Sequence, residues 1–476
     1  MMPLYETVVG LEIHVELATA SKVFCGCSTA FGGGQNTRAC PVCMGLPGAL
    51  PALNRQAVEY AVRAGLALNC SITKNAVFDR KHYFYPDLPK AFQISQLYLP
   101  LCVDGWVEVS GKRIRIREIH MEEDAGKLSH DPWTDVSLVD FNRCGAPLIE
   151  IVTQPDIRSA EEAVEAVRKI RAALSMLGVS DCKMQEGSLR VDVNLSVRPM
   201  GSDELGTRAE MKNINSLRSI GRAVTAETAR QIEQIELGKP IIQQTRRWDD
   251  SKGASSAMRS KEDALDYRYF PEPDLAPLSL SDEWIAERRA ALPELPEQKR
   301  KRYPVEFGLS AYDTDILVSE KALCELFERT AALCGRPKDA ANWIMGEVLA
   351  ALKDRGEPPD QLRLPPEALA RIITLQSDGV VNRNGARRAL TAVMSGEAED
   401  VDGYVTANQL AMVGDESALA GIVRQVMESD ADSVAAYRAG KEKAFGRLMG
   451  QAMKALRGKG DPGRLKELLT EALGEG

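Results

Sequence analysis

The feature that most constrains the fold is an abrupt change of residue pattern near Pro293 and Pro296. Before these prolines, strand and helix patterns are mixed, whereas beyond them the strand patterns nearly vanish. Residues 9–17 and 186–198 alternate strictly between apolar and polar side chains, which predicts two half-buried strands. Few strand pairs are joined by βαβ-like connections, so we expect an α+β region with a largely antiparallel sheet and packed helices.

The same change of pattern predicts how the chain divides into domains. With 476 residues, the chain is too long for one ordinary core. We expect an α+β domain over residues 1–292, an all-α helical domain over 293–405 and a small all-α tail domain over 406–476. Glycine and proline clusters near residues 335 and 356 break the helical domain into separate helices.

Charge separates the body of the chain from its end. The formal net charge of −8 argues against a protein that coats nucleic acid through bulk charge. Residues 438–466, in contrast, contain nine Lys or Arg and only two acids. No apolar run approaches the roughly 20 residues that span a bilayer, and the first residues lack the pattern of a signal peptide. We therefore expect a cytoplasmic protein.

Four of the ten cysteines lie close together near the start of the sequence. Cys25 and Cys27, followed after twelve residues by Cys40 and Cys43, can deliver four thiolates to one tetrahedral Zn²⁺. Without a secretory signal, a disulfide framework is the poorer explanation. Four protein ligands leave no open position for a substrate, so we expect a structural zinc in an insertion around residues 25–43. The alternative is a group of four reduced thiols without a metal.

Acidic side chains gather on the polar faces of the predicted strands. If these strands are neighbours, one face of the sheet carries Glu12, His14, Glu16, Glu186, Asp192 and Glu210. Such clustering is unfavourable unless cations occupy it, and Mg²⁺ suits both carboxylates and nucleotide phosphates. Residues 122–124 add three consecutive acids, and Glu150 lies within an apolar run. The alternative is a solvated outer face, because alternation alone cannot distinguish a cavity from bulk water.

Two stretches, residues 79–90 and 267–274, mix cations with aromatic rings. Cations can neutralise phosphates and rings can stack on bases, although loop aromatics packed on the core would give the same pattern. The sequence contains neither a Walker phosphate loop nor a G-x-G-x-x-G motif that opens a helix, and no recognisable Cys or Ser nucleophile motif. The residues alone therefore predict a magnesium-dependent enzyme that acts on phosphates.

Six stretches resemble the B subunit of the tRNA-dependent glutamyl/aspartyl amidotransferase, and they occur in that family's order. They are VGLEIHVEL at 9–17, the block at 78–96, HMEEDAGK at 120–127, LVDFNRCGAPLIEIV at 138–152, MQEGSLRVDVN at 184–194 and DYRYFPEPDL at 266–275. NWIMG at 342–346 and GRLMGQ at 446–451 resemble the family's helical and tail domains. The resemblance implies that residues 1–292 form the family's cradle domain.

The resemblance also implies a reaction. The family's B subunit uses ATP to phosphorylate the side-chain carboxylate of Glu on tRNA(Gln) or of Asp on tRNA(Asn), and ammonia then displaces the phosphate to give the amide. A glutaminase A subunit releases the ammonia from glutamine, and a small C subunit completes the heterotrimer. The chain would then be part of a carbon–nitrogen ligase with ATP and Mg²⁺ as cofactors and a structural Zn²⁺, and it would need no membrane.

By the same resemblance, seven residues would line the catalytic site: Glu12, His14, Glu123, Glu150, Glu186, Asp192 and Glu210. Of these, His14, Glu123 and Glu150 are expected to hold Mg²⁺. Lys81 and Arg190 are predicted to contact phosphates, on the logic of charge. The cysteines match the zinc-bearing members of the family; some relatives lack them, so we do not expect a catalytic zinc. The basic tail would grip tRNA phosphates without reading bases.

Departures from the family pattern are mild. Gln185 stands where the family usually has Glu, which removes one negative charge near the predicted metal site. Val191 and Val193 flank Asp192 where Cys and Ala are common. Two other functions stay open: a zinc-bearing tRNA scaffold whose acids form a solvated face, and a stand-alone ammonia ligase, similar to glutamine synthetase, that acts on a free amino acid.

Overall fold

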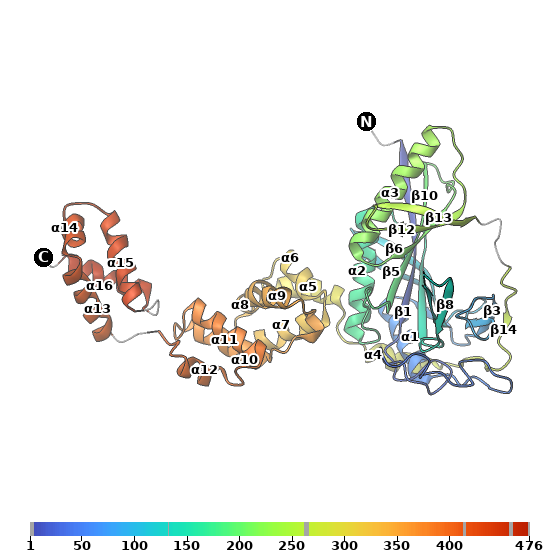
Figure 1. Ribbon diagram of the computed structural model, residues 1–476, viewed down its shortest axis with the longest axis horizontal. Helices are drawn as coiled ribbons and strands as arrows, with labels where there is room; N and C mark the ends of the chain where they lie inside the picture. Colours follow the sequence, from blue (N-terminus) through green and yellow to red (C-terminus); the bar gives the residue numbers. More distant parts are fainter. Residues whose placement is uncertain (1–3, 132, 261–265, 413–415, 457–459, 475–476) are drawn as a thin grey trace. The chain divides into compact units, whose positions relative to one another are not determined.

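The computed structural model describes residues 4–131, 133–260, 266–412, 416–456 and 460–474 (Figure 1). The chain forms two compact units, residues 1–299 and 300–476. The division lies within helix α5 (Pro296–Glu306), beyond the change of pattern at Pro293 that placed the predicted boundary at 292. Leu292 and Leu295 pack on the core of the first unit, so the connecting segment belongs to that unit.

A sheet of nine strands, counted over the described residues, forms the centre of the first unit. Its order is β13-β12-β11-β10-β1-β9-β6-β5-β2. Every neighbouring pair is antiparallel except the parallel pair of β11 and β12, which confirms the predicted largely antiparallel sheet. The strands are β1 (Tyr5–Glu16), β2 (Ser71–Ile72), β5 (Cys102–Val109), β6 (Lys112–Glu123), β9 (Pro147–Thr153), β10 (Leu189–Pro199), β11 (Ala209–Ile214), β12 (Gln244–Asp249) and β13 (Ala254–Ser260).

Helices cover one face of this sheet and leave the other face free for polar side chains. The apolar residues of β1 and β10 share one core with α1 (Arg55–Ala67), α2 (Ala160–Leu177) and α3 (Leu217–Glu236), and the short α4 (Asp282–Ala290) packs beside α1. The sequence sets these helix limits locally. At the start of α2, the Ser159 side chain accepts a hydrogen bond from the Glu162 N–H, and Gly178, with φ of 68°, ends the helix.

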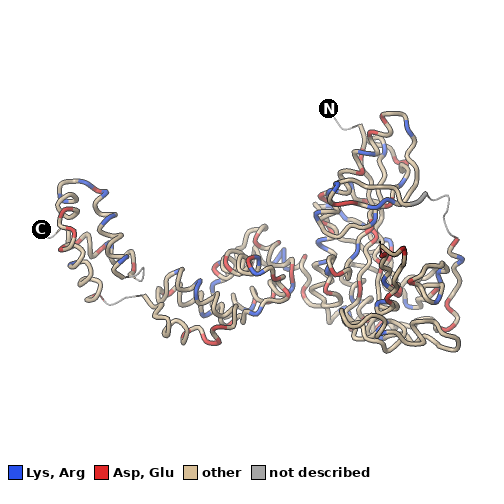
Figure 2. Tube along the Cα trace, viewed as in Figure 1, with Lys and Arg blue, Asp and Glu red and all other residues tan. Residues whose placement is uncertain are grey.

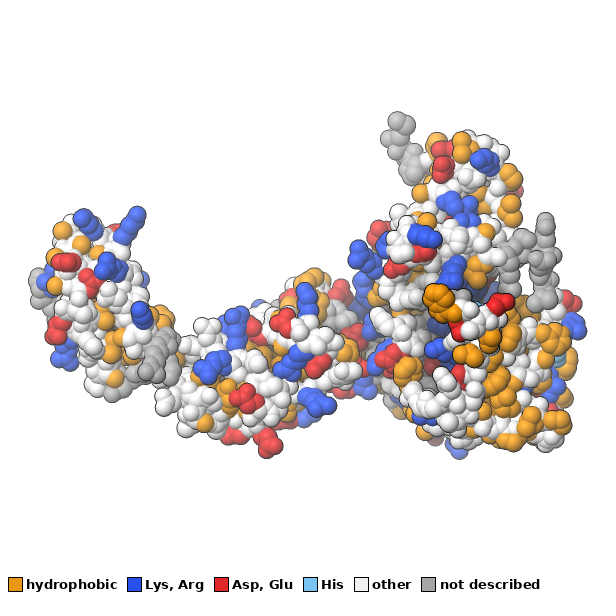
Figure 3. Space-filling model, in the orientation of Figure 1, with side chains coloured by type: hydrophobic (Ala, Val, Ile, Leu, Met, Phe, Trp, Pro, Cys, Tyr) orange, Lys and Arg blue, Asp and Glu red, His pale blue; other side chains and the backbone are white. Residues whose placement is uncertain are grey.

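A second, three-stranded sheet brings the two cation- and ring-bearing stretches together. In it, β3 (Asp79–His82) pairs with both β4 (Phe92–Ser95) and β14 (Phe270–Pro271). A separate hairpin consists of β7 (Lys127–Asp131) and β8 (Val136–Asp140). Several apolar side chains near β3 and β14 are exposed, including Phe84 at 74% and Tyr98 at 58%. Figure 3 shows hydrophobic side chains gathered over this part of the first unit.

The second unit is helical throughout its described residues. Its first part consists of α6 (Ala311–Leu317), α7 (Lys321–Cys334), α8 (Pro337–Trp343), a π-helical turn (Ile344–Val348), α9 (Leu349–Arg355), a 3₁₀ turn (Pro359–Gln361), α10 (Pro366–Ser377), α11 (Arg383–Ser395) and α12 (Val401–Ala407). The last four helices are α13 (Glu416–Ser429), α14 (Ala431–Arg438), α15 (Lys443–Ala455) and α16 (Pro462–Gly474). They pack around a core of their own that includes Leu419, Leu448 and Leu465.

The basic end of the sequence carries both signs of charge in the folded tail (Figure 2). Arg447 pairs with Asp430 at 2.9 Å, and Arg464 pairs with Glu416 and Glu467. Part of the positive charge counted from the sequence is therefore neutralised within the tail itself. Among the described residues, no helix is long and apolar enough to cross a membrane.

Candidate active site and metal sites

The face of the sheet opposite the helices gathers charged side chains from five strands. Along β1, the buried Leu11 and Ile13 alternate with Glu12 and His14, so the two polar residues face away from the helix-covered core. The register then fixes their neighbours. His14 lies opposite Glu150 of β9 on one side and Arg190 of β10 on the other, Glu12 lies opposite Asp192, and Asn194 lies opposite Glu210.

Three of these side chains form what we call the first acid group: His14, Glu122 and Glu150. Their ligand atoms all lie within 4.8 Å of one another. His14 Nδ1 is 3.5 Å from Glu122 Oε1 and 3.9 Å from Glu150 Oε2. A second imidazole supports the group, since His120 Nε2 lies 3.2 Å from Glu150 Oε2. The first acid group thus comes from three adjacent strands, and His120 of β6 adjoins it.

Imidazolium charges balance the carboxylates of the first acid group. Burial disfavours a charged His14, but its contacts with Asp192 and Glu122 outweigh this and raise the pKa of His14 to about 10. Burial also disfavours a charged His120, but the contacts with Glu118, Glu122 and Glu150 outweigh it and raise the pKa of His120 well above its usual range. The carboxylate neighbours therefore hold both rings in the charged form, where they act as counterions.

Glu12, Asp192 and Glu210 form the second acid group, with ligand atoms that also lie within 4.8 Å of one another. Here a lysine, rather than a histidine, supplies the positive charge that pairs with the carboxylates. Lys212 Nζ lies 2.5 Å from Asp192 Oδ2 and 2.8 Å from Glu210 Oε1. Burial and the nearby carboxylates, Glu150 and Glu210 foremost, raise the pKa of Glu12. The two groups adjoin, because His14 Nε2 is only 3.8 Å from Asp192 Oδ2.

The donor set of both groups fits a hard divalent cation. Carboxylate oxygens crowd together in a partly buried site, where burial and then the neighbouring carboxylates raise the pKa of Glu12. Mg²⁺ binds such oxygens and commonly bridges one or two of them to nucleotide phosphates. The first acid group is the better candidate, because a bound cation can take the place of the His14 proton; the second group already holds the ammonium of Lys212.

Glu123, predicted as a magnesium ligand, lies on the other face of β6. There it pairs with Lys90, accepts a hydrogen bond from the Ile94 N–H at 2.9 Å and is 2% exposed. Successive side chains of a strand point to opposite faces, and the register places His120 opposite Glu150. Glu122, two residues after His120, therefore shares the face of Glu150, and Glu123 does not. The structure thus places Glu122, and not the predicted Glu123, beside His14 and Glu150.

Glu186, predicted as a catalytic residue, joins neither acid group. Its side chain is 42% exposed and lies 3.4 Å from Lys183 Nζ. The alternating pattern seemed to begin at residue 186, but β10 starts only at Leu189. Gly187, with φ of 86°, turns the backbone just before the strand and takes Glu186 out of the alternation.

The two predicted phosphate contacts come from different elements, Arg190 from β10 and Lys81 from β3. Arg190 donates to Asp124 Oδ2 at 3.0 Å and lies on the face that carries His14. Lys81 Nζ lies 4.9 Å from the ring centre of Tyr267. In the second aromatic stretch, residues 267–274, burial raises the pKa of Tyr269, and the charge of Glu122 is the next largest cause. Tyr269, in the second aromatic stretch, therefore lies near the carboxylate of Glu122.

Sequence reasoning missed three members of the site: His120, Glu122 and Lys212. His120 and Glu122 lie two residues apart in β6, a spacing that places both on one face of a strand. Lys212 follows Glu210 by the same spacing on β11. The spacing could have grouped each pair, but only the register across strands shows which carboxylates they meet.

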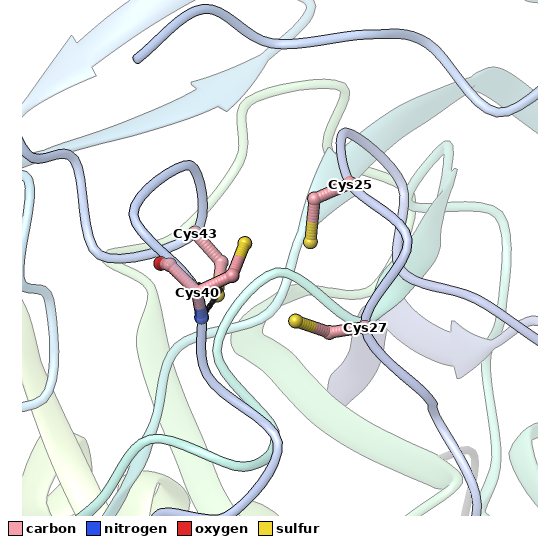
Figure 4. A group of neighbouring side chains, drawn as sticks. All are labelled: Cys25, Cys27, Cys40 and Cys43. Atoms are coloured by element: carbon pink, nitrogen blue, oxygen red, sulfur yellow. Dashed lines mark hydrogen bonds between the residues drawn. The ribbon is translucent and has the colours of Figure 1, made fainter. Parts of the chain in front are cut away.

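The four clustered cysteines point their sulfurs toward one another, with Cys25 and Cys27 on one side and Cys40 and Cys43 on the other (Figure 4). All four are free thiols. The Sγ atoms of Cys40 and Cys43 are 3.9 Å apart, and a regular zinc tetrahedron with Zn–S bonds of about 2.3 Å has sulfurs about 3.8 Å apart. The cluster therefore fits a tetrahedral ion with four thiolate ligands.

Comparison with known proteins agrees with this architecture. The family model described as the GatB/GatE catalytic domain matches residues 7–286, and the one described as the GatB domain matches residues 325–473. Two similar relatives each bear the name of the B subunit of an aspartyl/glutamyl-tRNA(Asn/Gln) amidotransferase. The protein of Lachnoclostridium phytofermentans is 53% identical over 99% of both chains, and that of Lachnospira eligens is 54% identical over 98% of this chain and 99% of its own. The chain therefore belongs to the GatB family of amidotransferase proteins.

Proposed function

We propose that this chain is the B subunit of a tRNA-dependent amidotransferase and that it activates the side-chain carboxylate of Glu on tRNA(Gln), or of Asp on tRNA(Asn), with ATP. The observation that carries the proposal is the pair of adjoining acid groups on the open face of the sheet. Relatives about half identical over their full length bear the amidotransferase name. Family membership supports the proposed reaction, and the acid groups are its proposed location.

Activation is needed because a carboxylate is unreactive toward ammonia. In the proposed first step, a side-chain carboxylate oxygen attacks the γ-phosphorus of ATP, and the bond to the bridging oxygen breaks and releases ADP. In the second step, ammonia attacks the acyl carbon, loses a proton, and phosphate departs with the electron pair of the carbon–oxygen bond. The enzyme's task is to position the reactants and neutralise charge on the phosphoryl group.

Mg²⁺, held by His14, Glu122 and Glu150, would supply charge neutralisation at the transferring phosphate. Arg190 and Lys81 would contribute fixed positive charge to bind the phosphates. Asp192 orients His14 through their contact, and His120 does the same for Glu150. The acceptor carboxylate must enter beside these groups as an additional anion, which explains why so many cations line the acidic face.

Three further features bear on the proposed partners and on the proposed structural metal. Exposed apolar side chains around β3 and β14, such as Phe84 and Tyr98, suit a protein partner, and the glutaminase A subunit with a small C subunit is the proposed one. The partner would supply ammonia. The tail, with cations such as Lys441 and Lys454, would contact tRNA phosphates. The cysteine cluster would hold a structural zinc that shapes residues 25–43.

The test is ATP turnover by the co-expressed assembly with glutamine, with and without Glu-tRNA(Gln). Wild type is compared with Glu150→Gln and with the matched control Glu186→Gln, which alters an exposed carboxylate outside both acid groups. We expect turnover that requires the charged tRNA, collapses in Glu150→Gln and persists in Glu186→Gln. Turnover that survives in Glu150→Gln would favour a tRNA scaffold, and turnover with free glutamate would favour a stand-alone ligase.

A further inference from the structure

Lys22 is a completely buried lysine at the edge of the cysteine cluster. Its side chain is 0% exposed, although lysine is almost never fully buried without a partner. Its ammonium donates to the Arg38 carbonyl at 2.7 Å, to the Phe141 carbonyl at 3.3 Å and to Cys43 Sγ at 3.5 Å. An ammonium has three N–H donors, so each is used.

No carboxylate accounts for this charge. Within the described part of the chain, no Asp or Glu oxygen lies within ion-pair distance of Lys22 Nζ, whereas the neighbouring Lys90 pairs with Glu123. A buried charge without a counter-charge is costly. Carbonyl oxygens supply dipoles only, so the sulfur of Cys43 is the one contact of Lys22 that can carry a full negative charge.

Cys43 is the cysteine at which negative charge most needs compensation. Four thiolates around a divalent cation sum to a net charge of −2. Cys43 is 4% exposed and is the buried member of the four; the other three are half-buried. Its sulfur already accepts a hydrogen bond from the Cys40 N–H at 3.1 Å. Water cannot share the remaining charge, and Lys22 meets that sulfur directly.

The backbone holds Lys22 against both halves of the cluster. Its N–H donates to the Cys27 carbonyl at 2.9 Å, while its ammonium reaches Cys43. The next residue, Val23, donates to the Gly145 carbonyl at 2.9 Å. Gly145 adopts φ of 83°, and a Cβ there would lie 3.5 Å from both Lys22 Cδ and Cys43 Cβ. The lysine is therefore fixed between the two cysteine pairs.

We infer that Lys22 is the built-in counterion of the metal–thiolate centre formed by Cys25, Cys27, Cys40 and Cys43, and that its positive charge governs how tightly the protein retains the ion. The inference rests on the zinc site of the proposed function. Lys22 is not a ligand of the ion. Like the hydrogen-bond donors that commonly surround metal ligands, it would stabilise the metal-bound form of a ligand.

The experiment measures zinc in the full-length chain. Wild type is compared with Lys22→Met, which removes charge and hydrogen bonds, and with Lys22→Gln, which removes charge but keeps N–H donors. Lys252→Met, at a 78% exposed lysine, is the control for the same loss of net charge. Zinc content is determined by elemental mass spectrometry, and the rate of zinc release is followed with a chromogenic chelator at a fixed concentration.

We expect wild type and Lys252→Met to hold about one zinc and to release it at the same slow rate. Both Lys22 variants should release zinc at least about tenfold faster, the lower end of the usual effect of altering such a partner. A Lys22→Gln variant with the wild-type rate would overturn the inference, because hydrogen bonding rather than charge would then suffice. Unchanged release in Lys22→Met would overturn it as well.

Two controls separate the inference from its foundation and from folding. If purified wild-type protein contains no zinc, the zinc site of the proposed function is wrong. If wild type contains zinc and the variants release it at the wild-type rate, only the role of Lys22 is wrong. Thermal unfolding of zinc-free protein gives the second control. The neutral variants should be at least as stable as zinc-free wild type, since they lack an uncompensated buried charge. Variants that stay unfolded even in excess zinc would show that Lys22 acts through packing, and would overturn the inference.

Discussion

The two acid groups share one sheet face and similar carboxylates, yet they differ in the cation that the chain itself supplies. The first group, His14, Glu122 and Glu150, is balanced by imidazoles. The second, Glu12, Asp192 and Glu210, is balanced by the ammonium of Lys212. An imidazole that loses its proton becomes a metal ligand, whereas an ammonium can only compete with a metal. The first group is therefore suited to bind a metal, and the second to position its neighbours.

The largest expected effect is the loss of catalysis when the first acid group is altered. Glu122→Gln should lower tRNA-dependent ATP turnover by at least about 10²-fold, because a metal at a transferring phosphate contributes several kcal/mol. Glu210→Gln in the second group should cost only about tenfold. Steady-state ATP turnover by the assembly measures both. Equal losses would break the comparison and indicate that the two groups act together as one two-metal site.

Glu123→Gln should act on stability rather than on metal binding. The change leaves the buried Lys90 without its carboxylate, and breaking a buried ion pair by removing one partner costs about 3–5 kcal/mol. Urea unfolding of the isolated chain measures this loss, with Glu186→Gln as the exposed control. Mn²⁺ affinity should stay within about twofold of wild type, well short of the 10–100-fold that a change near a metal ligand costs. A weakened Mn²⁺ site with unchanged stability would return Glu123 to the first acid group.

Lys212→Met should turn the second acid group into a cation site. Without the ammonium, only His14, whose Nε2 lies 3.8 Å from Asp192 Oδ2, offsets the charge of Asp192, Glu210 and Glu12. We expect the variant to bind an additional Mn²⁺ per chain, with at least about tenfold tighter affinity than this group shows in wild type. Electron paramagnetic resonance of free Mn²⁺ counts the bound ions. Identical stoichiometry in the variant and wild type would show that Lys212 does not exclude a metal.

Patterns within one segment were readable from the sequence, whereas pairings between segments were not. The alternation in residues 9–17 gave the orientation of Glu12 and His14, and the spacing of the cysteines gave their cluster. Two adjacent acids in one strand, however, cannot be assigned to a face until a partner strand sets the register, so the residue pattern alone could not decide between Glu122 and Glu123. Glu186 failed for a local reason, since the positive φ of Gly187 ends the alternation before the strand begins.

The smallest expected effect concerns the outer edge of the second acid group. Thr245 is 4% exposed on β12, and its hydroxyl donates to Glu210 Oε2 at 2.9 Å. Thr245→Val keeps the shape and removes that hydrogen bond to a charged group, which should lower the free energy of unfolding by about 1.5–3 kcal/mol. Thr225→Val, at an exposed threonine of α3, is the matched control in urea unfolding. ATP turnover should fall no more than about threefold, because Lys212 still holds the Glu210 carboxylate. If turnover instead falls as far as it does in Glu122→Gln, the second group takes part in the reaction directly, and the division of roles between imidazole and ammonium fails.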